Sequence, residues 1–209
     1  METMRNNQNR TLIVLSLALG IAGCADEEID SDEAARRAYL CLDPSIAKSL
    51  ELGFAGFNSA QSANISPQSA AGTATGTMTV TGQVDQGSSD NKGMRLRVKM
   101  LDWSVGVVQV PMPDSDPVGV KLTYNTAEAV EMQPYLQLQL RNIPSGTFTG
   151  TLTGTYAIRG DLEGDVVLNL SMSGNLQAVG SGTQRAAGTT TVTGTATSGE
   201  GVYMVNVRL

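Results

Sequence analysis

The chain contains no histidine, and this absence excludes several kinds of site at once. A Ser-His-Asp triad, a Cys-His nucleophile and a His-ligated metal centre all need an imidazole. Aromatic residues are only 4% of the 209 residues, and 14 basic residues face 20 acidic ones, for a net charge of −6. Because nucleic-acid-binding proteins carry basic faces, this balance argues against a nucleic-acid partner. We expect no cofactor.

Glycine is abundant, with 23 residues, and threonine recurs through the second half of the chain. This composition is typical of short strands and tight turns rather than of helices. A chain of this length accommodates one domain with additional segments at its ends.

The first 24 residues have the pattern of an export signal. Arg5 and Arg10 form a positive region, and an apolar run follows from Thr11 to Gly20. This run is shorter than the about 20 residues that a membrane-spanning helix needs, but it has the dimensions of the apolar part of a signal peptide. It ends in Ile21-Ala22-Gly23-Cys24.

Small residues before a cysteine at the end of such a run closely resemble the lipobox of bacterial lipoproteins. The resemblance implies cleavage before Cys24, diacylation of its sulfur and lasting membrane attachment, since each buried methylene contributes about 0.8 kcal/mol. In this family an aspartate after the cysteine favours the inner membrane. Ala25 stands there instead, so we expect an outer-membrane protein, facing the periplasm or the surface. An ordinary cleaved signal peptide with a chance cysteine is the alternative.

Composition and periodicity divide the chain into five segments. We expect a signal peptide at 1–23, an acidic tether at 24–30, a helical segment at 31–57, a linker at 58–72 and a β domain at 73–209. The linker is predicted because Ser, Ala, Gln and Asn dominate that stretch.

Two helix starts are predicted in the helical segment. Asp30 with Glu33 fits the first. Asp43 followed by Pro44 fits the second, since an N-cap acid precedes a proline at the first helical position. Apolar residues then recur at helical spacing as one stripe: Ile46, Leu50, Phe54 and Phe57. We expect this stripe to pack against one mouth or one face of the β domain.

From Thr73 onward the apolar period changes from 3.6 to 2. The segments 94–100, 166–172 and 203–209 alternate as half-buried antiparallel strands do, and further strands are expected at 105–110, 118–124 and 135–140. Three Thr-x-Thr-Gly copies, which begin at Thr79, Thr151 and Thr191, predict hairpins with turns at Gly87, Gly164 and Gly199. The expected fold is all-β: an antiparallel meander of about eight or nine strands, forming a barrel or a sandwich, after a short helical segment.

Threonine rows mark one face of these strands, at 77–81, 147–155 and 189–197. Between 147 and 156 every odd position is threonine, while the even positions alternate large and small residues, as in the interior of a curved sheet. Such threonine rows suit the wet face of a sheet, and they can also bind ordered water, sugars or another β-surface.

One pair of motifs resembles parts of an enzyme. Ser45-Ile-Ala-Lys48 and Ser89-Asp90-Asn91 match two elements of penicillin-binding proteins and serine β-lactamases, but the third element, K-T-G, is absent. A hairpin loop explains the second motif and a helix turn explains Ser45. We therefore expect no enzyme, and an envelope hydrolase is a remote alternative.

Three acids are weak candidates for calcium: Asp161, Glu163 and Asp165. Their spacing matches no complete calcium loop, and acidic hairpin tips also keep sheet edges soluble. The pair Asp114 and Asp116 has the same two explanations. We expect no metal site.

Cys41 is the second cysteine of the chain and lies among apolar neighbours. That setting predicts a buried small hydrophobe, with an intermolecular disulfide as the alternative.

The sequence thus predicts a lipid-anchored, non-enzymatic protein of the cell envelope with a β-rich binding or structural domain. Its expected partner is the membrane, through acyl chains on Cys24, with a further envelope or extracellular partner unidentified. Two versions stand open. A barrel carries an apolar ligand or lipid in its cavity, or a solid body displays loops and a threonine face.

Overall fold

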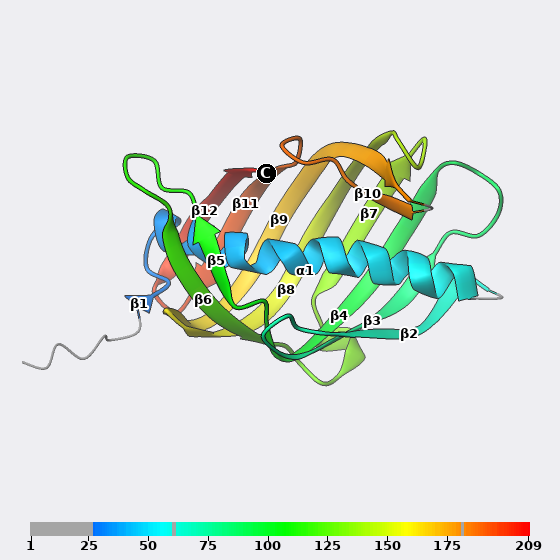
Figure 1. Ribbon diagram of the computed structural model, residues 1–209. Helices are drawn as coiled ribbons and strands as arrows, with labels where there is room; N and C mark the ends of the chain where they lie inside the picture. Colours follow the sequence, from blue (N-terminus) through cyan, green and yellow to red (C-terminus); the bar gives the residue numbers. More distant parts are fainter. Residues whose placement is uncertain (1–26, 60–61, 181) are drawn as a thin grey trace, which may run out of the picture.

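The computed structural model describes residues 27–59, 62–180 and 182–209, which form one N-terminal helix and a mostly antiparallel sheet of twelve strands (Figure 1). The expected fold class is confirmed at this level. The predicted signal peptide and Cys24 lie outside the described residues. The elements are β1 (Glu27–Glu28), α1 (Asp32–Ser59), β2 (Asn64–Ala71), β3 (Thr75–Val84), β4 (Lys92–Ser104), β5 (Val107–Val110), β6 (Val118–Asn125), the 3-10 turn η1 (Val130–Met132), β7 (Tyr135–Arg141), β8 (Thr147–Gly160), β9 (Leu162–Val179), β10 (Gly182–Arg185), β11 (Thr191–Ser198) and β12 (Gly201–Arg208).

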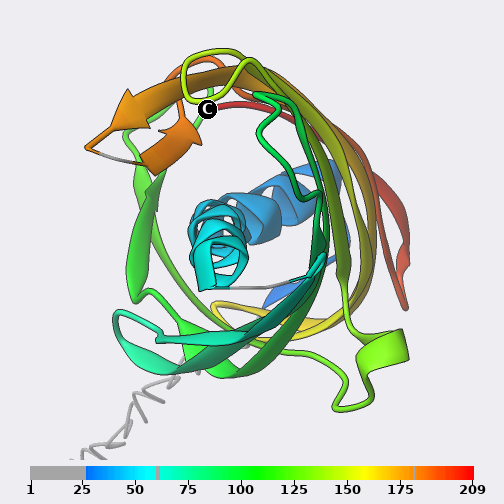
Figure 2. The same cartoon turned by 90° about the vertical axis from the view of Figure 1, so that its right-hand side faces the viewer.

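The main path of the sheet runs β12-β11-β9-β8-β6-β4-β3-β2, and β7 pairs with both β4 and β8. Strands β1 and β10 pair with β9, and β5 pairs with β6. Figure 2 shows the sheet curling around α1, so that the helix lies on its concave side. Among the described strands no pairing joins β12 to β2, and α1 contacts both of these end strands.

Each copy of the repeated Thr-x-Thr-Gly sequence places a glycine inside a strand of this curved sheet. Its glycines, Gly82, Gly154 and Gly194, lie inside strands with φ of 126°, 147° and 148°. A Cβ on Gly82 would lie 2.1 Å from the carbonyl oxygen of Arg95, and one on Gly194 would lie 2.2 Å from that of Asn169. Only glycine permits this conformation and this close approach, and glycine kinks let a sheet bend.

The helix is one continuous element, whereas the sequence predicts two starts. Ser31, not Asp30, is the N-cap: its Oγ accepts a hydrogen bond from the Ala34 N–H at 3.1 Å. Pro44 lies inside the helix, so Asp43 does not cap a second one. Burial of both halves on the concave side of the sheet outweighs the one backbone hydrogen bond that Pro44 cannot make.

The helix packs closely against the sheet, as expected. The first two members of the apolar stripe at 46–57 are buried, and its two phenylalanines are half-buried against the core. A Cβ on Gly53 would lie 3.1 Å from Leu96 Cδ1, and one on Gly56 would lie 2.8 Å from Ile65 Cβ. The two glycines therefore allow a close approach that larger residues would prevent.

Three strands lie where the sequence predicts none, which raises the strand number from eight or nine to twelve. β1 and the buried Ile29, which is 1% exposed, fall in the predicted tether, and β10 falls in a part of the predicted β domain to which no strand was assigned. β2 falls in the predicted linker; it contains Pro67 and lacks apolar alternation, as an edge strand can. Its pairing with β3 makes it a strand.

The hairpin turns are placed correctly in two of the three repeats. Gly87 lies between β3 and β4, and Gly199 lies between β11 and β12. Gly164 is a wrong prediction: it lies inside β9, and the turn from β8 to β9 is at Asp161. Its φ of 128° resembles that of the other glycines inside strands.

Candidate functional site

The concave side of the sheet holds α1 and a cluster of aromatic side chains. Tyr39, Tyr124 and Tyr156 are each at most 1% exposed. The rings of Tyr124 and Tyr156 pack edge to face with centroids 6.3 Å apart. The Tyr124 hydroxyl donates a hydrogen bond to the carbonyl oxygen of Ala38, on α1, at 2.7 Å. These side chains occupy the space around the middle of α1, while a groove of about 420 Å³ lies between α1 and the segment 184–190.

A groove of about 460 Å³ lies on the outward face of the sheet and crosses β7, β8, β9 and β11. Strand pairing places its polar residues in two parallel rows, Gln139-Thr149-Ser173-Thr191 and Gln137-Thr151-Ser171-Thr193. We call these eight residues the polar grid. Neighbouring strands lie about 4.8 Å apart and alternate residues of a strand about 6.8 Å apart, so the grid is regular.

The side chains of the polar grid are uncharged, exposed and free of internal partners. Within the described part of the chain, no hydrogen bond engages any of the eight side chains. On the outward face of β2, β3 and β4, by contrast, several polar side chains are paired. There the hydroxyls of Ser69 and Thr79 lie 2.7 Å apart, and Arg95 pairs with Asp85 at 2.7 Å. The grid therefore offers hydroxyl and amide groups that only solvent or a ligand can satisfy.

The three calcium candidates lie near β1, at one end of the sheet. An Oδ of Asp161 accepts a hydrogen bond from the Lys121 backbone N–H at 2.7 Å, while Glu163 and Asp165 are exposed on β9. Glu163 and Asp165, but not Asp161, line part of a second groove, of about 450 Å³, together with Arg159. No group of three or more acids or cysteines among the described residues is arranged to hold a metal ion. Asp114 and Asp116 are exposed in the loop between β5 and β6.

The two motifs that resemble penicillin-binding enzymes do not form a site. Ser45 is 0% exposed and its hydroxyl has no hydrogen-bond partner, while Lys48 pairs with Glu51 at 2.6 Å. In the loop between β3 and β4, the Asn91 N–H donates to the Ser89 hydroxyl at 3.1 Å, as expected for a turn.

Cys41 is buried in the core and 2% exposed, which confirms the prediction of a small buried hydrophobe. Burial and, to a smaller extent, the charge of Asp161 raise the pKa of its thiol to about 12, although Arg37 opposes the change. A thiol in this setting is protonated and inert at neutral pH.

An ion pair that sequence reasoning missed joins α1 to β10. Arg185 Nη2 lies 2.6 Å from Asp43 Oδ2, and the Tyr39 hydroxyl donates to the other carboxylate oxygen at 3.0 Å. Burial is the largest single influence and acts to lower the pKa of Arg185, but the hydrogen bond to Asp43, the charge of Asp43 and the contact with Tyr39 together raise the pKa. In the sequence, Asp43 is visible as an acid within an apolar segment, but Pro44 after it indicated a helix cap and not an ion pair.

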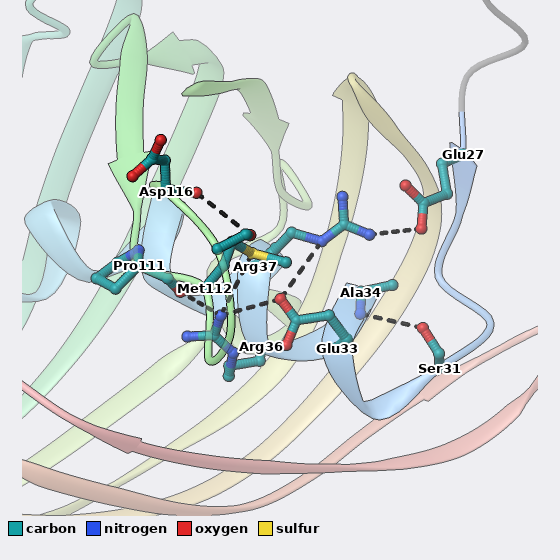
Figure 3. A network of polar contacts seen from close by, with 10 residues as sticks. Glu27, Ser31, Glu33, Ala34, Arg36, Arg37, Pro111, Met112 and Asp116 are labelled. Carbon is teal, nitrogen blue, oxygen red and sulfur yellow. Dashed lines mark hydrogen bonds and ion pairs between the residues drawn. The ribbon is translucent and has the colours of Figure 1, made fainter. Parts of the chain in front are cut away.

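Two arginines tie the start of α1 to distant segments (Figure 3). Arg36 donates to Glu33 at 2.7 Å and to the Pro111 carbonyl oxygen at 2.5 Å. Arg37 pairs with Glu27, the first described residue, at 2.5 Å. The chain is thus held to the helix within three residues of Cys24.

Among the described residues, no helix combines the length and apolar character that crossing a membrane would require. No protein-family model, no curated protein and no solved structure matches the chain.

Proposed function

We propose that the protein is a lipid-anchored, non-enzymatic component of the bacterial cell envelope that binds a partner through the polar grid. The observation that carries the binding role is the set of eight exposed polar side chains without internal hydrogen bonds on the outward face of the sheet. The lipobox-like sequence before Cys24 supports the anchor. The outer membrane is the proposed location, since Ala25 follows the cysteine.

The position of Cys24 supports an arrangement in which the grid lies well away from the lipid. Glu27 follows it by three residues, so their Cα atoms lie at most about 11 Å apart. An acylated Cys24 would hold the β1 end of the sheet at the membrane. Ser171 comes nine residues after Leu162, which pairs with β1. The grid therefore lies about 30 Å along β9 from the anchored end.

Carriage of an apolar ligand is the second candidate, and the packing of α1 argues against it. A carrier would have to expel a helix whose Ala34, Tyr39 and Leu42 are at most 1% exposed. The sequence predicts either a barrel or a sandwich. Of these two forms we propose the barrel, with α1 bridging the two end strands of the sheet.

Metabolic labelling tests the anchor. The full chain, expressed in a Gram-negative host with an alkyne analogue of palmitate, is expected to carry label and to fractionate with the outer membrane. Cys24→Ser should abolish both, while the control Cys41→Ser should keep both because Cys41 is buried and inert. An unmodified residue 24 in the processed protein would overturn the anchor.

Thiol protection tests the binding role independently of the ligand's chemistry. The variant Thr193→Cys places a thiol within the grid. With an impermeant maleimide, this thiol is expected to react at least fivefold more slowly in permeabilised cell envelopes, where a bound partner covers it, than in the purified protein. Thr77→Cys, exposed on β3 outside the grid, should react equally in both. Equal reactivity of Thr193→Cys in both preparations would contradict a partner on the grid.

A further inference from the structure

We propose that the polar grid binds a neutral polysaccharide chain that lies across β7, β8, β9 and β11. This inference rests on the proposed binding role of the grid and names the chemistry of its ligand.

The lining of the groove selects against charged and apolar ligands. All ten lining residues are uncharged, eight form the grid, and the other two are Gly150 and the buried Met172. An anionic ligand is normally held by arginine or lysine, and a lipid needs an apolar lining. Serine and threonine hydroxyls and glutamine amides both donate and accept hydrogen bonds, as the hydroxyls of a neutral sugar do.

The position of the groove in the sheet selects against a peptide strand. A peptide that extends a sheet needs an edge with free backbone groups. All four strands of the grid are paired on both sides. β7 lies between β4 and β8, β8 lies between β7 and β9, β9 lies between β8 and β11, and β11 lies between β9 and β12. Only side chains are available for recognition, and they extend about 14 Å across the four strands.

The absence of an aromatic ring from the lining determines the kind of binding expected. Hydrogen bonds exchanged with water contribute little individually, so one groove binds weakly. Many anchored copies on one surface, or many repeats on one polymer, would raise the apparent affinity by multivalency. A polymer therefore suits the grid better than a single sugar.

Affinity electrophoresis tests this proposal. The processed protein, purified from membranes of cells that express the full chain, is kept in a polyoxyethylene detergent, which carries no sugar. It is run in native gels containing dextran, soluble starch, mixed-linkage β-glucan or galactomannan. The wild type is expected to be retarded at least twofold by at least one of these neutral polymers.

Paired variants on the same strands supply the control. Thr151→Val with Thr193→Val removes two grid hydroxyls at nearly constant shape and should weaken binding at least tenfold. Thr155→Val with Thr197→Val makes the same changes on the same face of β8 and β11 but outside the groove, and should stay within twofold of the wild type.

Four outcomes would overturn the proposal. They are no retardation by any of the four polymers, equal weakening by both variant pairs, retardation only by anionic polysaccharides that salt abolishes, and a dimer that the grid variants dissociate. Protection of Thr193→Cys in envelopes without retardation would reject the polysaccharide and keep the proposed function. Loss of both would reject the two together.

Discussion

Asp43 and Arg185 form an ion pair on which we expect the stability of this protein to depend. Their side chains are 15% and 12% exposed, the least of any ion pair among the described residues. The guanidinium donates to both carboxylate oxygens, at 2.6 and 2.8 Å. Because loss of one partner leaves the other as an uncompensated buried charge, such pairs are costly to break.

We expect Asp43→Asn to lower the free energy of unfolding by about 3 kcal/mol, because Arg185 then has no carboxylate partner. Urea unfolding measures this change. The control is Lys48→Met, which removes the exposed pair with Glu51 and should cost less than about 1 kcal/mol. Equal costs for the two variants would contradict the structural role of the buried pair.

Cys41 gives a prediction on pH. The pKa of its thiol is about 12 in the folded protein and about 8.5 in an unfolded chain. Between these values only the unfolded state loses the proton, so this group lowers stability as the pH rises from about 9 toward 12. Cys41→Ala should therefore reduce the fall in the urea midpoint between pH 8 and pH 10. In addition, an aromatic disulfide reagent at pH 8 should label Cys41 only after unfolding; rapid labelling of the folded protein would disprove its burial.

At the scale of elements, the two end strands of the sheet are both protected against pairing with another chain. On β12 the Met204 N–H donates to an Asp32 carboxylate oxygen at 2.7 Å, at the start of α1. On β2, Pro67 lacks an N–H and the register shifts between Ile65 and Gln68. Covered donors, prolines and irregular edges all limit edge-to-edge association.

The glycine of the third repeat provides a test of the curvature. Gly194→Ala should lower the free energy of unfolding by more than about 2 kcal/mol, since φ is 148° and the new Cβ would lie 2.2 Å from the Asn169 carbonyl oxygen. Gly199→Ala in the adjoining turn meets nothing within 4 Å and should stay within about 0.5 kcal/mol. Similar effects at both positions would show that the kink is not required.

At the scale of the whole molecule, the proposed anchor at Cys24 and the sheet together predict an orientation on the membrane. Glu200 and Glu28 line the same groove at the β1 end of the sheet. Ser145 lies just before the start of β8, at the other end of the sheet, and β8 spans about 40 Å between the two ends. If Cys24 is acylated, these two ends lie at different heights above the lipid.

Energy transfer measures that difference. The acylated protein, labelled with a donor dye at Glu200→Cys or Ser145→Cys, is inserted into vesicles with acceptor-labelled headgroups. We expect stronger transfer from position 200, because the chain between Cys24 and Glu27 is short. Equal transfer, or stronger transfer from position 145, would contradict the orientation.

The sequence by itself determined the faces of the strands and several exclusions. Alternation with period 2 predicts Phe148 and Leu152 inward and Thr149 and Thr151 outward, and the structure agrees. This succeeds because burial on one face is a local pattern that each strand carries alone. The absence of histidine excludes its sites whatever the fold.

Only the tertiary structure decided how these pieces combine. It made α1 continuous through Pro44, turned 64–71 into β2 and gave Asp43 a partner 142 residues away. It also chose the register that brings Gln137, Thr151, Ser171 and Thr193 into one row of the grid. Local propensity encodes none of these outcomes, because each depends on the energy of contacts between segments far apart in the chain.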